Sequence, residues 1–197
     1  MTPRRLIVGI SGASGAIYGI RILQALQGSG IETHLVMSES ARITLAAESD
    51  ISAAAVEALA TQVHNVRNIG ASIASGSFKT MGMVVAPCSV RSLSELAWGT
   101  TSNLLTRAAD VVLKERRRLV LLLRETPLHA GHLQSMLQVT HSGAIVMPPV
   151  PAFYAQPKSI DDIVNHSVGR CLDLFDIDTD LVARWNGLGK AAQTPAQ

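Results

Sequence analysis

Small, hydroxyl-bearing and charged residues cluster in this sequence at the points where apolar runs end. The clusters are Ser11 to Gly15, Ser38, Pro87 to Ser92, Arg124 with Glu125, and Pro148 to Tyr154. Serine hydroxyls and free backbone N–H groups at the start of a helix bind anions, and an arginine clamps a phosphate through paired hydrogen bonds. These residue types predict a site for a phosphorylated, mononucleotide-like ligand.

The first cluster, Gly12-Ala13-Ser14-Gly15, brings small residues to the expected start of a helix. Its glycines, with Gly9, do not follow the G-x-G-x-x-G spacing of dinucleotide-binding folds. The second strand is expected to end at Ser38, where such a fold places a carboxylate for the ribose, although Glu39 is adjacent. The loop is therefore either an anion or ring-edge site or a tight turn without a ligand.

The other clusters also have a structural explanation beside the functional one. Ser89 would be either an ordinary helix N-cap or part of a second phosphate-binding position. By default, Arg107 and Lys114 would be exposed charges on helices. Arg124 instead follows a buried strand directly, a position where a charged side chain is uncommon and calls for a function. The proline-rich loop that ends at Tyr154 would be a stiff lid over the site or a rigid surface turn.

The histidines and cysteines do not indicate a metal site or a nucleophile. His129 and His132 are three residues apart on a predicted helix, without the further ligands that a metal needs. Cys88 has no evident histidine partner, and Cys171 is far away in the sequence. Two distant cysteines form no disulfide framework, which favours a reducing compartment.

Alternating strand and helix patterns position these clusters at one edge of a sheet. Strands are expected at residues 6–10, 33–37, 81–86, 119–123 and 144–147, and helices at about 18–26, 38–48, 53–66, 90–97, 103–117, 126–139 and 159–175. In the sixth helix we expect Thr126 as the cap and Pro127 at the first helical position. The pattern predicts a Rossmann-like (flavodoxin-like) α/β fold, a doubly wound parallel sheet in three αβα layers. Ligands of such sheets bind outside the carboxyl ends of the strands, where the clusters lie.

Composition favours one soluble domain that associates with copies of itself. The 197 residues are 47% apolar and 16% charged, against about 25% charged in average proteins. Subunit contacts or an alanine-rich core would explain the shortage of charge. A net charge of +2 gives no reason to expect nucleic acid. With no signal-peptide pattern and no run of about 20 apolar residues, we expect a cytoplasmic protein that does not enter a membrane.

Read in order, the clusters resemble motifs of the UbiX-type flavin prenyltransferases, formerly described as aromatic acid decarboxylases. The resemblance covers residues 4 to about 186. It rests on Gly-Ile-Ser-Gly-Ala-Ser-Gly from Gly9, Val-Met-Ser from Val36, Ala-Pro-Cys-Ser from Ala86, Arg-Ala-Ala-Asp-Val-Val-Leu-Lys-Glu-Arg-Arg from Arg107, Arg-Glu-Thr-Pro-Leu from Arg124 and Pro-Pro-Val-Pro-Ala-Phe-Tyr from Pro148. Arg118 departs from the family, which usually has proline there, and we expect little consequence.

The resemblance implies a metal-independent transferase that joins the dimethylallyl group of dimethylallyl monophosphate to N5 and C6 of reduced FMN. The prenylated FMN would serve UbiD-type decarboxylases, in ubiquinone biosynthesis or aromatic acid decarboxylation. It implies a homododecamer with sites at subunit contacts. It also implies a flavin-binding domain over residues 1–186, followed by a flexible tail over 187–197.

The resemblance also implies roles for single residues. FMN would be held by Gly12, Ala13, Ser14, Ser38, Ser89, Val90, Arg91, Ser92, Arg107 and Arg124. The allylic phosphate would be surrounded by Lys114, Arg124, Glu125, Tyr154 and Arg170. The catalytic set would be Ser14, Glu48, Lys114, Glu125 and Trp185, with Ser14 and Glu48 near the reacting flavin edge and Trp185 closing the site.

These residue types suit the implied chemistry, and two other functions remain open. Cationic side chains stabilise charge that grows on a leaving phosphate, and aromatic faces tolerate an allylic cation. One alternative is an FMN-dependent cysteine decarboxylase-like enzyme, whose active-site histidine and Asn-Met motif are not found here. The other is a non-catalytic FMN-binding protein, which would have no use for a second set of phosphate-binding residues.

Overall fold

A six-stranded parallel sheet forms the centre of the computed structural model, which describes residues 3–182, 184 and 187. The strands are β1 (Arg4–Ile10), β2 (Ile31–Met37), β3 (Gln62–His64), β4 (Gly82–Cys88), β5 (Arg118–Leu123) and β6 (Ile145–Val146). Their order is β3-β2-β1-β4-β5-β6, and every neighbouring pair is parallel. The order reverses between β1 and β4, and a doubly wound sheet binds its ligand at such a reversal.

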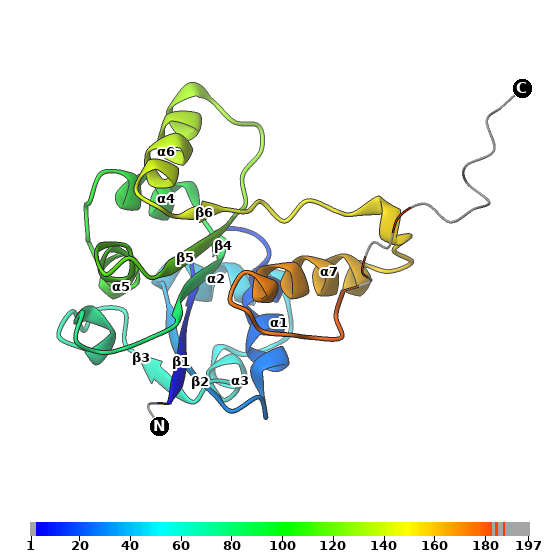
Figure 1. The fold of residues 1–197 in the computed structure, drawn as a ribbon, viewed down its shortest axis with the longest axis horizontal. Coiled ribbons are helices and arrows are strands. Elements are labelled where there is room, and N and C mark those ends of the chain that lie inside the picture. The colour runs from blue at the N-terminus through cyan, green and yellow to red at the C-terminus, as the bar shows by residue number, and fades with distance from the viewer. Residues whose placement is uncertain (1–2, 183, 185–186, 188–197) are drawn as a thin grey trace, which may run out of the picture.

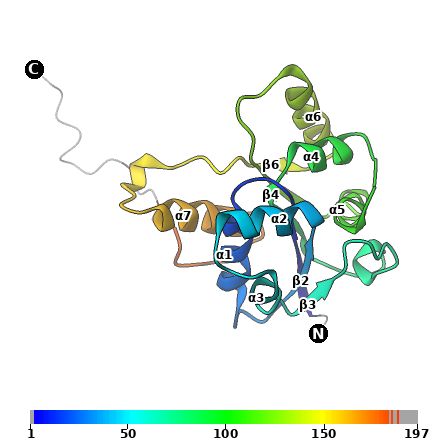
Figure 2. The same ribbon diagram turned by 180° about the vertical axis from the view of Figure 1, so that it is seen from behind.

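Helices cover both faces of the sheet, so the predicted three layers are confirmed (Figures 1 and 2). One core packs the sheet against α1 (Ala16–Leu26), α2 (Glu39–Glu48), α3 (Ala53–Glu57) and α7 (Ile160–Asp173). The other packs it against α4 (Val90–Ala97), α5 (Leu104–Lys114), α6 (Ala130–His141) and the short helix η1 (Ser72–Ala74). Alternate residues of β1 serve the two cores, with Leu6 and Val8 in the first and Ile7 in the second.

A long loop after β6 carries the chain away from the sheet (Figure 1). It ends in the short helix η2 (Phe153–Ala155), next to the start of α7. Ser159 caps α7 in a reciprocal arrangement with Asp162, whose side chain accepts from the Ser159 amide. Val150 and Phe153 in this loop and Ile160 at the helix start expose 70%, 75% and 80% of their surface, so this part of the chain presents three large apolar side chains to solvent.

The single helix expected over residues 53–66 is wrong. Only α3 forms there, and the chain then turns into β3, which pairs with β2. Thr61 drives this change, because its amide donates to the Thr33 hydroxyl at 2.9 Å and its own hydroxyl accepts from the Thr33 amide at 3.1 Å. Alanine content had favoured a helix, but β-branched residues that can pair across strands favour an edge strand.

The start expected for the sixth helix is also wrong. The peptide bond between Thr126 and Pro127 is cis, and α6 begins later, at Ala130. His129 is the cap, because its Nδ1 accepts from the Gly131 amide at 3.1 Å. Sequence rules give histidine little weight as a cap, so Thr-Pro was the stronger signal.

The remaining boundaries agree with expectation to within a few residues. α5 is shorter than the predicted range because Arg116 adopts φ 56° and the chain turns back toward the sheet. Among the residues that the structure describes, no helix is long and apolar enough to cross a membrane. The predicted tail, apart from Gly187, lies outside the described residues.

Candidate functional site

Ser11, a buried residue directly after β1, joins two of the predicted ligand loops. Its hydroxyl donates to the carbonyl of Pro87 at 2.8 Å and accepts from the amide of Ser89 at 2.7 Å. The loops after β1 and β4 are thereby held together at the reversal of the sheet. The sequence analysis gave Ser11 no role of its own, although a serine that ends a buried strand is a signal that could have been used.

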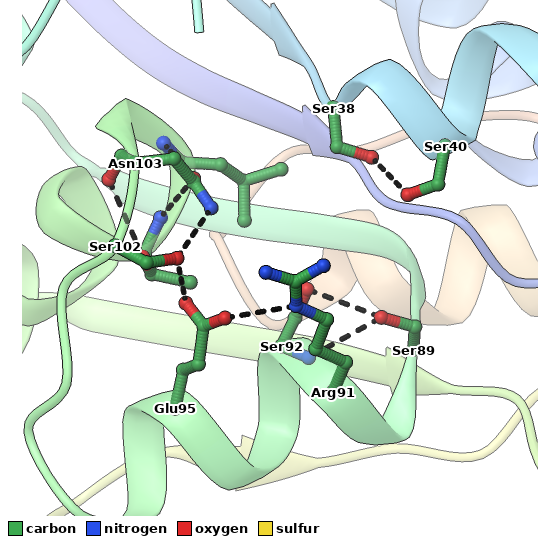
Figure 3. Close-up of polar contacts among 10 residues, drawn as sticks. Ser38, Ser40, Ser89, Arg91, Ser92, Glu95, Ser102 and Asn103 are labelled. Carbon is green, nitrogen blue, oxygen red and sulfur yellow. Dashed lines mark hydrogen bonds and ion pairs between the residues drawn. The ribbon is translucent and has the colours of Figure 1, made fainter. Parts of the chain in front are cut away.

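A cavity of about 420 Å³ opens beside these loops, and we call it the serine pocket (Figure 3). The starts of α2, α4 and α5 all contribute to its wall. Its lining consists of Ser38, Glu39, Ser40, Ile43, Val66, Arg67, Ser89, Arg91, Ser92, Glu95, Ser102 and Asn103. Because the positive ends of three helix dipoles meet here, the pocket suits an anionic group.

Each of these helices is capped by a side chain that also lines the serine pocket. The Ser38 hydroxyl accepts from the Ala41 amide at 3.0 Å, and the Ser89 hydroxyl accepts from the Ser92 amide at 3.3 Å. Asn103 Oδ1 accepts from the Leu105 amide at 2.9 Å. The two interpretations of Ser89, helix cap and anion-site residue, therefore do not exclude each other.

Glu95 organises the polar side of the serine pocket (Figure 3). Its carboxylate accepts from Arg91 Nε at 3.1 Å and from the Ser102 hydroxyl at 2.7 Å. Burial raises the pKa of Glu95, but hydrogen bonds from Ser102, Arg91 and Thr106 outweigh it and hold the pKa below its usual value. Glu95 is therefore ionised at neutral pH and fixes Arg91, a partnership that the sequence analysis missed although the i, i+4 spacing offered it.

The first loop approaches α2 so closely that Gly12 has no room for a side chain. A Cβ on Gly12 would lie 2.3 Å from Ser40 Oγ and 2.4 Å from Ser40 Cβ. Ala13 folds the loop tightly, because its amide donates to the Ser11 carbonyl at 2.9 Å. This glycine is therefore required by the contact between loop and helix.

The start of α1 is occupied by a carboxylate of the protein itself. Glu48, at the end of α2, accepts from the amide of Gly15 at 2.8 Å and from that of Ala16 at 3.4 Å. Burial raises the pKa of Glu48, while the Ser14 hydroxyl, these two amides and the charge of Arg124 lower it, and the net effect is a lowered pKa. The structure thus brings Ser14, Glu48 and Arg124 together. The anion-binding position expected at the start of α1 is occupied by the carboxylate of Glu48.

Arg124 follows β5 and faces the first loop. Its amide donates to the carbonyl of Cys88 at 3.0 Å, which ties the end of β5 to β4. Burial raises the pKa of Tyr18, and the charge of Arg124 acts in the opposite direction. Next to it, Glu125 accepts from the Thr126 amide at 3.0 Å. Arg124 therefore lies near Tyr18 and Glu48, on the side of the first loop.

Tyr154 and Arg170, both assigned to the allylic phosphate, meet through a histidine on α7. The Tyr154 hydroxyl lies 3.1 Å from His166 Nε2, and the two rings pack edge to face. Burial lowers the pKa of His166, and the nearby charge of Arg170 lowers it further. His166 was missed by the sequence analysis, although its i, i+4 spacing to Arg170 places both on one face of α7.

Within one chain the structure does not bring Lys114 to these groups. Lys114 ends α5 at the edge where β5 begins, and its Nζ lies 2.5 Å from Glu115. Arg107 pairs with Asp110 at 2.7 Å, one turn after the start of α5. Trp185 lies outside the described residues. The predicted set is therefore incomplete in a monomer.

Neither cysteine is suited to act as a nucleophile. Cys88 and Cys171 are buried, and burial raises the pKa of each thiol to about 12. Among residues 3–182, 184 and 187 the structure contains no group of three side chains that could hold a metal ion.

Known proteins share both the sequence and the fold of this chain. The family model named Flavoprotein matches residues 1–172. The flavin prenyltransferase UbiX of Thauera aromatica is 61% identical over 93% of this chain and 94% of the relative. That of Escherichia coli strain K12 is 60% identical over 93% of this chain and 99% of the relative.

Solved structures agree with these relatives. AnUbiX, crystallised with FMN and dimethylallyl pyrophosphate, superposes with a TM-score of 0.93 and 51% identity over 95% of this chain and 100% of its own. A dodecameric FMN-dependent UbiX-like decarboxylase from Escherichia coli O157:H7 gives 0.91 and 48%, over 93% and 100%. The FMN-dependent cysteine decarboxylase SpaF, at 18% identity and 0.60 over 73% and 82%, shares the fold alone. The chain therefore belongs to the Flavoprotein family and, within it, to the UbiX flavin prenyltransferases.

Proposed function

We propose that this chain joins the dimethylallyl group of dimethylallyl monophosphate to N5 and C6 of reduced FMN. The C–O bond of the donor breaks and inorganic phosphate leaves, donor carbons C1 and C3 replace the hydrogens on N5 and C6, and a proton is added to donor C2 as the double bond is consumed. One observation carries the proposal. The chain has two separate places that suit an anion, the serine pocket at three helix starts and the Tyr154–His166–Arg170 face of α7. A protein that only binds FMN has a single phosphate to hold.

The serine pocket and the first loop fit FMN. The pocket offers serine hydroxyls, helix starts and Arg91 to a phosphate, and its volume of about 420 Å³ admits one. Reduced FMN supplies a nucleophilic nitrogen when it is bound. We assign its binding to Gly12, Ala13, Ser14, Ser38, Ser89, Val90, Arg91, Ser92, Arg107 and Arg124.

Ser14 and Glu48 are assigned to proton transfer at the flavin edge. Glu48 is ionised at neutral pH because the Gly15 and Ala16 amides and the Ser14 hydroxyl lower its pKa against burial. An ionised carboxylate that is bonded to a hydroxyl can take a proton through that hydroxyl. Ser14 would pass on a proton released at the flavin edge, and Glu48 would accept that proton.

Charge on the leaving phosphate is assigned to Arg170, Arg124 and Lys114, with Tyr154 at its side. Fixed cations stabilise charge that develops as the C–O bond breaks. Glu125, beside Arg124, would exchange a proton with the phosphate. Trp185, outside the described residues, would close the site.

Lys114 must come from a neighbouring subunit for this site to be complete. In one chain it lies at the opposite edge of the sheet from the serine pocket. A homo-oligomer, by analogy with the dodecameric relative, would supply it. The exposed Val150, Phe153 and Ile160 would then be covered by other subunits. We place the enzyme in the cytoplasm, with a UbiD-type decarboxylase as recipient of the product.

The direct test mixes the purified protein with reduced FMN and dimethylallyl monophosphate without oxygen. We expect the flavin to gain one five-carbon unit by mass and to change its absorption spectrum. A parallel arm uses dimethylallyl pyrophosphate as the donor. Recovery of bound but unmodified FMN in both arms would reject the proposal in favour of a flavin-binding protein.

A further inference from the structure

Asp173, in the last turn of α7, holds two arginines from different parts of the chain. Arg184 approaches it in a bidentate manner, with Nη1 at 2.6 Å from Oδ2 and Nη2 at 2.7 Å from Oδ1. Arg170 Nη1 donates to the same Oδ2 at 2.6 Å. One carboxylate therefore joins the end of α7 to the segment that follows it.

We propose that Asp173 is a positioning residue for the donor phosphate. It fixes the guanidinium of Arg170 and, through Arg184, ties the chain that follows α7 to the end of that helix. This inference rests on the proposed function, because it takes Arg170 as a ligand of the dimethylallyl phosphate.

A second contact, independent of the ion pairs, places the same segment against α7. A Cβ on Gly169 would lie 2.3 Å from Val182 Cγ2 and 3.1 Å from Leu181 Cβ. Residues 179–182 therefore pack directly on α7 at Gly169, the residue that immediately precedes Arg170. The segment is packed on the helix at Gly169 and bonded to it at Asp173.

The ion pairs at Asp173 differ from ordinary surface pairs, which contribute little. The Asp173 side chain is only 15% exposed, while those of Arg170 and Arg184 are each 47% exposed. Hydrogen bonds from Arg184 and then Arg170 outweigh burial and keep the pKa of Asp173 below its usual value. A partly buried, ionised carboxylate with a bidentate partner defines the direction of its arginines.

The division of bonds leaves Arg170 able to bind a ligand. Arg184 uses both oxygens of Asp173, whereas Arg170 uses only Nη1 in this contact. Nε and Nη2 of Arg170 remain for a phosphate.

The test compares Asp173→Asn with Asp176→Asn in the full-length enzyme. Asp176 is a matched control because it pairs with Arg118 at 3.0 Å, away from Arg170, and asparagine tolerates its left-handed φ of 55°. We expect Asp173→Asn to raise KM for dimethylallyl monophosphate about tenfold, as for a lost charge-assisted contact. Its FMN affinity should stay unchanged, and the control should behave as wild type.

Two further measurements separate positioning from mere stabilisation. Calorimetric titration with dimethylallyl monophosphate should show the same loss of affinity, and hydrogen exchange of residues 179–182 should speed up. Arg184→Ala, on the half-exposed partner, should act in the same direction. The double variant should be no worse than the poorer single, because both changes break one contact.

The outcomes distinguish this inference from the proposed function. If the wild-type protein transfers no prenyl group, the proposed function fails. If wild type is active and Asp173→Asn loses thermal stability with KM unchanged, Asp173 only stabilises the fold and the inference is overturned. Should Asp173→Asn not fold, Arg184→Ala decides, and a wild-type KM in that variant overturns the inference.

Discussion

The carboxylate of Glu48 lies 2.8 Å from the amide of Gly15, so that the end of α2 caps the start of α1. Helix starts in this fold commonly hold the ligand's phosphate. Here that position is taken, and the anion is left to the starts of α2, α4 and α5. The proposed function therefore assigns proton transfer to the first loop and binding of the anion to the serine pocket.

Glu48→Gln should separate these two tasks. Glutamine can still accept from the Gly15 amide, but it cannot take a proton, so the rate of prenyl transfer should fall by at least about a hundredfold. FMN affinity should change little, and the free energy of unfolding should drop by about 1 kcal/mol from the lost charge at the helix start. Single-turnover kinetics and flavin fluorescence titration measure the two effects. Equal losses in both would contradict the proton-transfer assignment.

Ser14→Ala should slow transfer more than it weakens flavin binding. The Ser14 hydroxyl bonds to Glu48, and its removal interrupts the route of the proton. Ser40→Ala is a matched control, because Ser40 bonds to the cap Ser38 at 3.1 Å and lines the serine pocket. That variant should change FMN affinity and leave the rate at saturating FMN near wild type.

Gly12→Ala should weaken FMN binding and cost about 1–3 kcal/mol of stability, because the added methyl group collides with Ser40. The double variant with Ser40→Gly should recover most of both, since the colliding side-chain atoms are then absent. Chemical denaturation and flavin titration provide the readouts. A Gly12→Ala protein as stable as wild type would show that the first loop can move away from α2.

Lys114→Ala and Arg170→Ala should complement each other in mixed oligomers. Each variant alone should turn over poorly at low donor concentration, because each lacks a cation for the phosphate. If Lys114 acts in a neighbouring subunit, co-expression restores some complete sites. Absence of any recovery would place both residues in the same chain's site, against the location of Lys114 at the end of α5.

Acid should destabilise the protein through two buried histidines at the sheet edge. His34 Nδ1 lies 3.0 Å from His64 Nε2. Burial and the neighbouring His64 lower the pKa of His34 to about 4, and burial lowers that of His64. The unfolded chain, with a pKa near 6.5, then binds more protons, so stability should fall as the pH drops from about 6.5 to about 4.

Urea unfolding across that pH range measures the effect. Glu32 and Arg5, which pair with each other at 2.7 Å, also face His34. His34→Gln should make the unfolding midpoint less dependent on pH. A variant with the same slope as wild type would assign the acid sensitivity to other groups.

Much of the fold could be predicted because local patterns determine it. The strong apolar runs at β1, β4 and β5 and the serine caps of α2 and α4 were all located from sequence. The edge strand β3 was not, because it is only three residues long. Its pairing depends on the contact between Thr61 and Thr33, which no local pattern reveals.

The candidate site was predictable only in part, for the same reason. Ser38, Ser89 and Arg91 stand at strand ends, so their convergence follows from the parallel sheet. Ser102 and His166 meet Glu95 and Tyr154 across loops, which no local pattern reveals, whereas the i, i+4 spacings of Glu95 to Arg91 and of His166 to Arg170 were signals left unused. The distance of Lys114 from the other site residues could not be predicted for a different reason. The spacing of residues along one chain does not tell whether a side chain would complete a site in its own subunit or in a neighbouring one.

The hydroxyl of Ser11 gives the binding edge a mechanical property. Since it bonds at once to Pro87 and to Ser89, a displacement of the loop after β1 must carry the loop after β4 with it. We therefore expect these two loops to move together. If the serine pocket opens to admit a ligand, we expect its other walls, at the starts of α2 and α5, to be the parts that move.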